Sequence, residues 1–308
     1  MTLRVAIVGL GKIARDQHVP SIAAVDGVEL TAVASRNASL PGVACFATLD
    51  EMLERADLFD AVALCTPPQV RHGQALAALS AGKHVLLEKP PGATVSEVAP
   101  LVALARRNGV VLFATWHSRF APAVEPARTF LASTTVRSVR IEWKEDVRKW
   151  HPGQEWIWEP GGLGVFDPGI NALSIMTAIL PRPVFLTQSD LFFPANRAAP
   201  IAASLAFADG HGVPVAAEFD WRETSGEIWN IVVETDAGTL TVADGGKRMR
   251  VDGALRVDEP DREYAAIYRR FAGLAADGAV DVDLSPLQHV ADAFLLGRRR
   301  VVDEFVES

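Results

Sequence analysis

The feature that most constrains this chain is the regular alternation of short apolar runs with helical segments before residue 118. Strands are expected at residues 3–8, 28–34, 61–64, 84–87 and 110–115. Helices are expected between them, at residues 12–24, 49–56, 70–81 and 95–108. This order is typical of a parallel sheet covered by helices on both faces, so we predict an α/β domain over residues 1–118.

The pattern changes after residue 120. Residues 136–146 alternate charged and apolar side chains, as a half-exposed antiparallel strand does. Similar segments follow at 201–208, 213–221, 228–235 and 238–243, and helices are expected at 168–180, 264–276 and 286–307. We therefore predict a second, α+β domain with a mostly antiparallel sheet over residues 119–308.

Composition excludes several classes of protein. The 308 residues carry a formal net charge of −8, which argues against a nucleic-acid binder. No uncharged apolar run reaches the roughly 20 residues of a membrane helix, and the N-terminus has no signal-peptide pattern. Two cysteines are too few for a disulfide framework. We expect a cytoplasmic protein without a membrane partner.

A glycine-rich turn joins the first strand to the first helix. In Gly9-x-Gly11-x-x-Ala14, the first glycine suits a tight turn and the second lets the backbone approach a pyrophosphate. The helix that follows offers free N–H groups to the anion. A plain structural turn is the alternative. The position predicts a dinucleotide site of the Rossmann type that includes Gly9, Gly11, Lys12 and Ile13.

The end of the second strand bears on the choice of cofactor. NAD-specific sites normally place a carboxylate there for the ribose 2′-hydroxyl. This chain has Ser35 and Arg36, and an arginine can pair with a 2′-phosphate. We predict NADP as the cofactor, with NAD also accepted, while a solvated surface arginine remains the alternative interpretation.

Glu88, Lys89 and Pro90 stand where an apolar strand stops. In an open α/β sheet the carboxyl ends of the strands face the ligand crevice. Because the proline blocks continuation of the strand, the lysine is expected to be directed at a ligand.

Several motifs along nearly the whole chain resemble the Gfo/Idh/MocA oxidoreductases. They are the glycine turn, Cys65-Thr66-Pro67-Pro68 with His72, Gly82-Lys83-His84 with Glu88-Lys89-Pro90, and Gly161-Gly162-x-Gly164-x-x-Asp167-x-Gly169-x-Asn171. The resemblance implies a Rossmann domain followed by a substrate-binding and oligomerisation domain with an open-faced sheet. It also implies Lys89 near nicotinamide and substrate, with Thr66, Pro67, His72 and Glu88 around the cofactor.

One departure points to a subgroup. Where the family motif usually ends in histidine, this chain has Asn171, which cannot act as a base. It resembles the aldose 1-dehydrogenases, which oxidise the anomeric carbon of L-arabinose or D-galactose to a lactone. That subgroup also resembles this chain at the substrate-binding positions His117, Glu145, Trp150 and Trp229. A non-catalytic NADP-binding regulator of the same fold and a cyclic-polyol dehydrogenase remain alternatives.

The expected catalytic set is Asp167, Asn171 and Lys89. Asp167 precedes a proline and could simply cap a helix, but Asn171 lies four residues on, on the same helix face. A carboxylate and an amide in that arrangement suit a sugar hydroxyl, and we expect Asp167 or Lys89 to take its proton. No cluster of His or Cys suggests a metal.

The residues matched to the sugar subsite also have structural interpretations. His117 could cap a strand end and Glu145 could be a solvated strand charge. Trp150 and Trp229 could be core residues, although a tryptophan face suits the C–H face of a pyranose. The unpaired face of the second sheet predicts a homo-oligomer.

Overall fold

The computed structural model describes residues 2–307, which form two compact units. Unit 1 contains the residues up to 117 together with 264–284. Unit 2 contains residues 118–263 and those from 285 onward. The division expected from the sequence falls at the same place near residue 118, but it assigned residues 264–284 to the second domain.

Unit 1 is built on a six-stranded sheet in the order β3-β2-β1-β4-β5-β6, with every pair parallel. The strands are β1 Leu3–Val8, β2 Val28–Ala34, β3 Ala44–Phe46, β4 Ala61–Leu64, β5 His84–Leu87 and β6 Leu112–Ala114. This is the strand order of the dinucleotide-binding fold, so the predicted Rossmann domain is confirmed.

The helices of unit 1 are shorter at several ends than the sequence indicated. A π-helical turn at Ala14–His18 leads into α1. The helices are α1 Val19–Ala23, α2 Leu49–Leu53, α3 Pro68–Ser80, α4 Val98–Asn108 and α8 Glu263–Asp277. Among residues 2–307, no helix is both long enough and apolar enough to span a membrane.

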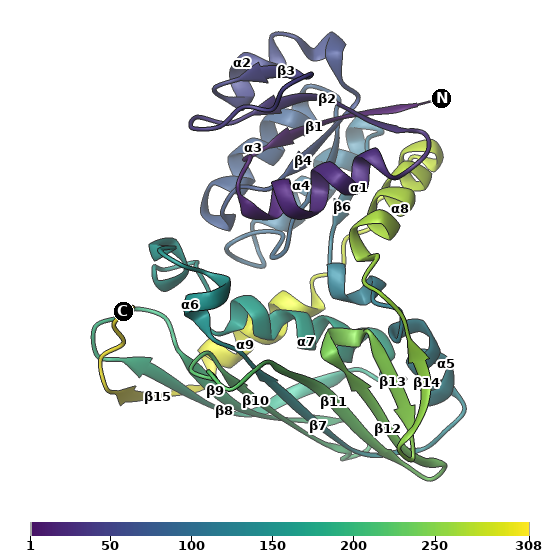
Figure 1. Ribbon diagram of the computed structural model, residues 1–308, viewed down its shortest axis with the longest axis vertical. Coiled ribbons are helices and arrows are strands. Elements are labelled where there is room, and N and C mark those ends of the chain that lie inside the picture. The colour runs from purple at the N-terminus through teal and green to yellow at the C-terminus, as the bar shows by residue number, and fades with distance from the viewer. Residues whose placement is uncertain (1, 308) are drawn as a thin grey trace. The chain divides into compact units, whose positions relative to one another are not determined.

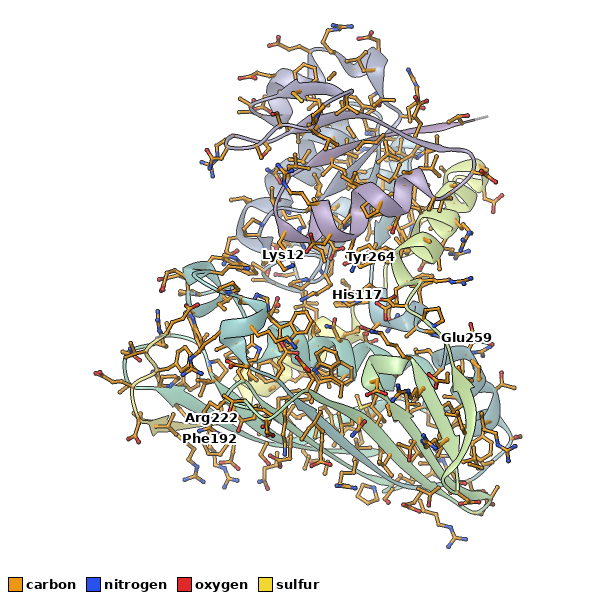
Figure 2. The ribbon with its side chains drawn as sticks, in the orientation of Figure 1. Lys12, His117, Phe192, Arg222, Glu259 and Tyr264 are labelled. Atoms are coloured by element: carbon orange, nitrogen blue, oxygen red, sulfur yellow. The ribbon has the colours of Figure 1, made fainter. Side chains whose placement is uncertain are left out.

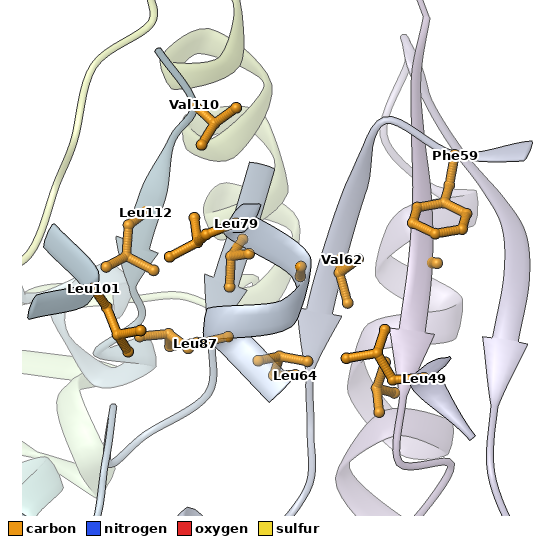
Figure 3. Packing of buried hydrophobic residues seen from close by; sticks show 14 of the residues in the cluster. Leu49, Phe59, Val62, Leu64, Leu79, Leu87, Leu101, Val110 and Leu112 are labelled. Atoms are coloured by element: carbon orange, nitrogen blue, oxygen red, sulfur yellow. The ribbon is translucent and has the colours of Figure 1, made fainter. Parts of the chain in front are cut away.

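The helices α2, α3 and α4 bury one face of this sheet. Figure 3 shows Leu49, Leu79 and Leu101 from these helices packed with Leu64 and Leu87 from the strands. The opposite face is also covered, since Phe113 of β6 stacks on Phe271 of α8 with ring centroids 6.2 Å apart. Burial on both faces explains why the strands are apolar at nearly every position.

Unit 2 is built on a nine-stranded sheet in the order β14-β13-β12-β11-β7-β10-β9-β8-β15. Its strands are β7 Val136–Lys144, β8 Val184–Pro194, β9 Ala202–Asp209, β10 Pro214–Asp220, β11 Ile228–Thr235, β12 Gly238–Ala243, β13 Arg248–Val251, β14 Ala254–Asp258 and β15 Gly297–Val302. The pairs are antiparallel except β7–β10 and β8–β15. The predicted mostly antiparallel sheet is confirmed.

Helices lie along one side of the sheet in unit 2, as Figure 1 shows for α5, α7 and α9. Their bounds are α5 Val124–Ala132, α6 Val147–Trp150, α7 Phe166–Ile179 and α9 Ser285–Leu295. Short 3-10 turns lie at His117–Phe120 and Glu155–Trp158. The homo-oligomer expected from the other, open face stays a prediction.

The helix expected at 286–307 is wrong in its second half, where the structure has strand β15. Helix α9 ends at Leu295 and β15 begins at Gly297, whose added Cβ would lie 2.6 Å from the Ala293 carbonyl oxygen. After it, Arg298 and Arg300 both bind the carboxylate of Asp190 on β8. Asp190, which lies 108 residues before Arg298, therefore stabilises a strand at this segment. The local sequence pattern could not reveal this partner.

The first prediction compares the two glycines of the turn after β1. An alanine Cβ at Gly9 would lie 2.9 Å from Thr66 Cγ2, and the backbone φ of Gly9 is +91°. At Gly11 an added Cβ meets nothing within 4 Å. Gly9→Ala should therefore lower the free energy of unfolding by about 1–3 kcal/mol. Gly11→Ala, the matched control, should leave it nearly unchanged but weaken dinucleotide binding, measured by calorimetric titration. Equal stability of the two variants would contradict this account.

Candidate functional site

The turn after β1 has the shape that a dinucleotide phosphate needs. Gly9 N–H donates to the Ala34 carbonyl (2.9 Å), and the helical run begins at residue 12. Gly11 is exposed and its missing side chain leaves the backbone open to a close approach. Lys12 and Ile13 are exposed beside it, with Lys12 paired to Asp16. These residues fit the predicted nicotinamide dinucleotide.

Ser35 and Arg36 follow β2 as the sequence indicated. Ser35 N–H donates to the Phe46 carbonyl (2.9 Å), which fixes the backbone there. Arg36 is exposed and forms no ion pair with any residue of the described range 2–307. A guanidinium in this state is available to an anion, and its role toward a 2′-phosphate stays a prediction.

A buried arginine that the sequence analysis missed organises the loops after β4 and β5. Arg71 in α3 is 3% exposed and donates to the carbonyl oxygens of Thr66, Glu88 and Pro90. In the same helix His72 Nδ1 donates to the Glu97 carbonyl (3.0 Å). Arg71 thus holds the Thr66 loop beside the loop that carries Lys89.

The carboxylate of Glu88 is buried in a polar network of unit 1. Its Oε1 lies 2.9 Å from His18 Nε2 and accepts a bond from the Tyr264 hydroxyl (2.8 Å). Its Oε2 accepts the backbone N–H of Lys89 (2.8 Å). Burial opposes ionisation, but His18, together with His117 and the Tyr264 hydroxyl, outweighs it and lowers the pKa of Glu88 to about 2. Glu88 therefore acts on the site by fixing the backbone at Lys89.

His18, Tyr264 and Tyr268 complete this network and were not predicted. His18 is fully buried, and its Nδ1 lies 2.7 Å from the Tyr268 hydroxyl oxygen. The ring of His117 stacks on Tyr264 with centroids 5.5 Å apart, and both are labelled in Figure 2. His117, expected as a sugar contact, is thus half-buried and held by an aromatic face.

The second cluster lies in unit 2 around Glu145, which directly follows β7. The Glu145 side chain is 4% exposed, and its two oxygens accept the indole N–H groups of Trp221 (3.3 Å) and Trp229 (2.9 Å). Burial raises the pKa of Glu145 to about 7. The charge of His151 and the hydrogen bonds from the two indoles oppose this rise but do not cancel it. Glu145 is therefore not the solvated strand charge of the alternative interpretation.

Two further aromatic rings pack against Trp229, one of the indoles bound to this carboxylate. Trp229 stacks on Trp143 with centroids 6.0 Å apart and contacts the ring of Trp150 at 5.6 Å. Trp150 and Trp229, both expected from the sequence as sugar contacts, lie side by side in the structure. Trp221 was not predicted; it is fully buried and binds the same carboxylate.

The glycines of the last motif are packing positions in the structure. A Cβ at Gly162 would lie 2.1 Å from the Trp156 carbonyl oxygen, and one at Gly164 would lie 2.4 Å from that of Pro200. Gly169 lets α7 approach β10, where a Cβ would meet Phe219 Cδ2 at 2.7 Å. The absence of side chains therefore fixes the start of α7 tightly.

Asp167 and Asn171 both lie in the first turns of α7. The helix begins at Phe166 after the N-cap residue Val165, so the interpretation of Asp167 as the cap is wrong. Asp167 is 3% exposed. Asn171 is half-buried, and its side-chain amide makes no hydrogen bond to another residue of the described range. The amide is therefore available to a ligand.

A histidine that the sequence analysis did not consider pairs with Asp167. His151 Nε2 lies 3.2 Å from Asp167 Oδ2, while the ring contacts Trp221 at 5.3 Å between centroids. His151 follows the short helix α6, and nothing in its local sequence marks it. Unit 2 thus gathers two buried carboxylates, a histidine and an amide beside tryptophan rings, a set that suits the hydroxyl groups and the C–H face of a sugar.

Comparison with known proteins agrees with this chemistry. A family model described as an oxidoreductase family with an NAD-binding Rossmann fold, Gfo/Idh/MocA, matches residues 3–115. Galactose 1-dehydrogenase of Pseudomonas fluorescens is 47% identical over 305 residues, which is 99% of each chain. The crystal structure of D-galactose-1-dehydrogenase from Rhizobium etli superposes with a TM-score of 0.95 at 58% identity, covering 99% of this chain and 98% of that one. A 3-ketoreductase from Actinomadura kijaniata, at 19% identity and a TM-score of 0.84, shares the fold.

The second prediction concerns Glu145 and stability. Because its pKa is raised in the folded protein, ionisation opposes folding, and this group lowers stability as pH rises from about 4.5 to about 7. Relative to wild type, Glu145→Gln should gain on the order of 2–3 kcal/mol of unfolding free energy between pH 5 and pH 8. Denaturant unfolding followed by tryptophan fluorescence reports unit 2, which holds six of the seven tryptophans, all except Trp116.

The control for this measurement is Glu125→Gln on the surface of α5. The neighbouring Arg128 lowers the pKa of Glu125, so this carboxylate is ionised throughout the same pH range. Its substitution should give an effect that does not change between pH 5 and pH 8. A Glu145→Gln effect that is equally constant would show that the buried carboxylate does not titrate near neutrality.

Proposed function

Because the chain belongs to the Gfo/Idh/MocA family of oxidoreductases, we propose that it is an aldose 1-dehydrogenase that oxidises D-galactose and L-arabinose in their pyranose forms to the aldonolactones. The observation that carries the proposal is the 47% identity to galactose 1-dehydrogenase along essentially the whole chain. The carboxylates, amide and indole rings gathered in unit 2 support a sugar as the substrate. The two sugars differ only at the exocyclic carbon, so one set of contacts can serve both.

Unit 1 is proposed to bind the cofactor, with NADP preferred and NAD accepted. Gly9, Gly11, Lys12 and Ile13 would hold the pyrophosphate, and Ser35 with Arg36 would hold the 2′-phosphate. Thr66, Pro67 and His72 would complete the site, with Glu88 acting through the backbone of Lys89. When bound, the oxidised cofactor would supply the acceptor for a hydride from the anomeric carbon of the sugar.

The chain's own residues handle the charge and the proton of the reaction. The anomeric hydroxyl must lose its proton as the hydride leaves, and Asp167 is the proposed acceptor. The ammonium group of Lys89 stabilises negative charge that develops on the sugar oxygen. The amide of Asn171, which makes no other hydrogen bond to the described chain, orients that hydroxyl.

Sugar recognition is proposed for the remaining residues. Trp150 and Trp229 would pack against the C–H face of the pyranose, and Glu145 and His117 would bind its hydroxyl groups. Glu145 already accepts one hydrogen bond on each oxygen, and a carboxylate oxygen can accept a second. The buried position of Glu145 strengthens such a bond relative to one in water.

The third prediction tests the cofactor assignment. Arg36→Ala should raise the Michaelis constant for NADP more than tenfold, because a charge-assisted contact is worth about 1.5–3 kcal/mol, and should change that for NAD much less. Arg107→Ala, an exposed arginine at the end of α4, is the matched control and should change neither constant. Equal effects of Arg36→Ala on both cofactors would remove the 2′-phosphate role.

The fourth prediction tests the reaction itself. Wild-type protein should reduce NADP with D-galactose and L-arabinose in a panel of pentoses and hexoses followed by nicotinamide absorbance. Asp167→Ala should lower turnover by roughly 10²–10⁴ while cofactor affinity, measured by calorimetric titration, stays nearly the same. Asp303→Ala, an exposed acidic residue of unit 2, serves as the control.

Two outcomes would contradict these assignments. No reduction with any aldose would reject the dehydrogenase function. Near-normal turnover in Asp167→Ala together with an inactive Lys89→Ala would show that lysine, not aspartate, accepts the proton.

A further inference from the structure

We propose that His151 and Asp167 act as one proton-accepting pair, in which the proton released by the sugar hydroxyl passes from Asp167 to the ring of His151. This inference rests on the proposed function. An isolated aspartate is a weak base, with a usual pKa of about 3.9. His151 acts through Asp167, so it is a positioning residue. It also holds the proton that Asp167 passes on.

The protonation of the His151 ring is fixed by its other neighbour. Gln154 Oε1 accepts the indole N–H of Trp156 at 3.1 Å. An indole nitrogen can only donate, so this side-chain atom must be the amide oxygen and not the nitrogen. The same oxygen lies 3.4 Å from His151 Nδ1. Nδ1 therefore carries the hydrogen in the neutral ring.

The consequence lies at the opposite side of the ring. With its hydrogen on Nδ1, neutral His151 presents the lone pair of Nε2 to Asp167 Oδ2, 3.2 Å away. Two acceptors at that distance are complementary only when one proton lies between them. A proton taken up by the carboxylate therefore gains a hydrogen bond to Nε2 at once, and the pair binds it more tightly than Asp167 could alone.

The proton balance of the reaction follows directly. The O–H bond of the anomeric hydroxyl breaks, the C–H electron pair leaves as hydride to the nicotinamide cofactor, and the C=O bond of the lactone forms. The proton goes to Asp167 and then to His151 Nε2. The His151 side chain is 17% exposed, whereas that of Asp167 is 5% exposed, so the ring is the member that can return the proton to water.

Other charged groups surround the pair in unit 2. Those on the adjoining segments include Glu145, Arg148, Lys149, Glu155 and Glu307, together with the ion pair of Asp220 and Arg222 on either side of Trp221. Arg148 pairs with Asp146, Lys149 with Glu227, and Glu155 with Arg197. The charge of Glu145 interacts with both His151 and Asp167. Its titration must therefore be separated from that of the pair in any experiment.

The test is the pH dependence of kcat in His151 variants. A pair that is already protonated cannot accept the sugar proton, so wild-type turnover should fall as pH decreases. His151→Gln keeps a polar amide group near the position of Nε2, but an amide cannot take up the proton. It should lower kcat at neutral pH by about tenfold to a hundredfold and move the acid limb to lower pH. His211 is an exposed histidine of the β9–β10 turn, and His211→Gln should leave both kcat and the acid limb unchanged.

Two results would contradict the proposal. If His151→Gln keeps the kcat and the acid limb of wild type while His151→Ala loses activity, the ring only places Asp167 and the proposal is rejected. If the acid limb persists in His151→Gln and disappears in Glu145→Gln, the limb belongs to Glu145 and the proposal is likewise rejected.

A second measurement uses only the wild-type protein and requires no enzymatic turnover. Histidine-selective ¹⁵N spectra of the wild-type protein should show the His151 ring with its hydrogen on Nδ1 at high pH. A hydrogen on Nε2 would overturn the shared-proton geometry. Because this readout involves no sugar, it stands even if no aldose is oxidised, so failure of the inference and failure of the proposed function are distinguishable.

Discussion

A carboxylate that is buried away from water needs hydrogen-bond donors or an opposite charge beside it. Three buried carboxylates organise the candidate functional parts of this protein. Glu88 is 3% exposed, Glu145 is 4% exposed and Asp167 is 3% exposed. Each is compensated by different groups. Glu88 has a histidine and a tyrosine hydroxyl, Glu145 has two indole N–H groups, and Asp167 has a histidine. The partner decides what each acid can do.

The contrast between Glu88 and Glu145 shows this most clearly. His18 beside Glu88 keeps that carboxylate ionised, with a pKa of about 2, so it serves as a fixed acceptor for the backbone of Lys89. Glu145 has only neutral donors bound to it, and burial raises its pKa to about 7. An acid that titrates near neutrality can respond to a ligand, whereas one that is always ionised can hold a backbone in place.

Glycines provide the second constraint, because they set the close approaches that bring these acids to their places. Gly9 lets the turn after β1 approach Thr66, and Gly162 and Gly164 let the chain approach Trp156 and Pro200 before α7. Gly169 lets α7 pack on Phe219. In each case a side chain would collide with backbone or ring atoms that cannot move away cheaply. These glycines are therefore as necessary to the site as the polar residues they position.

The sequence by itself determined the elements whose signals are local. The alternation of apolar runs and helices established the Rossmann domain, and the period-two alternation established most strands of the second sheet. The glycine turn, Lys89, Asp167 and Asn171 could be proposed as site residues because their motifs are contiguous in the sequence. Only the tertiary structure decided the pairing of buried groups, because His18 with Glu88, Trp221 with Glu145 and His151 with Asp167 are separated by 16 to 76 residues. The same physical reason explains β15, whose arginines form ion pairs with Asp190 on β8, a strand that is adjacent in the sheet but distant in sequence. A hydrogen-bond partner that is remote in sequence leaves no local pattern, and its identity appears only when the chain has folded.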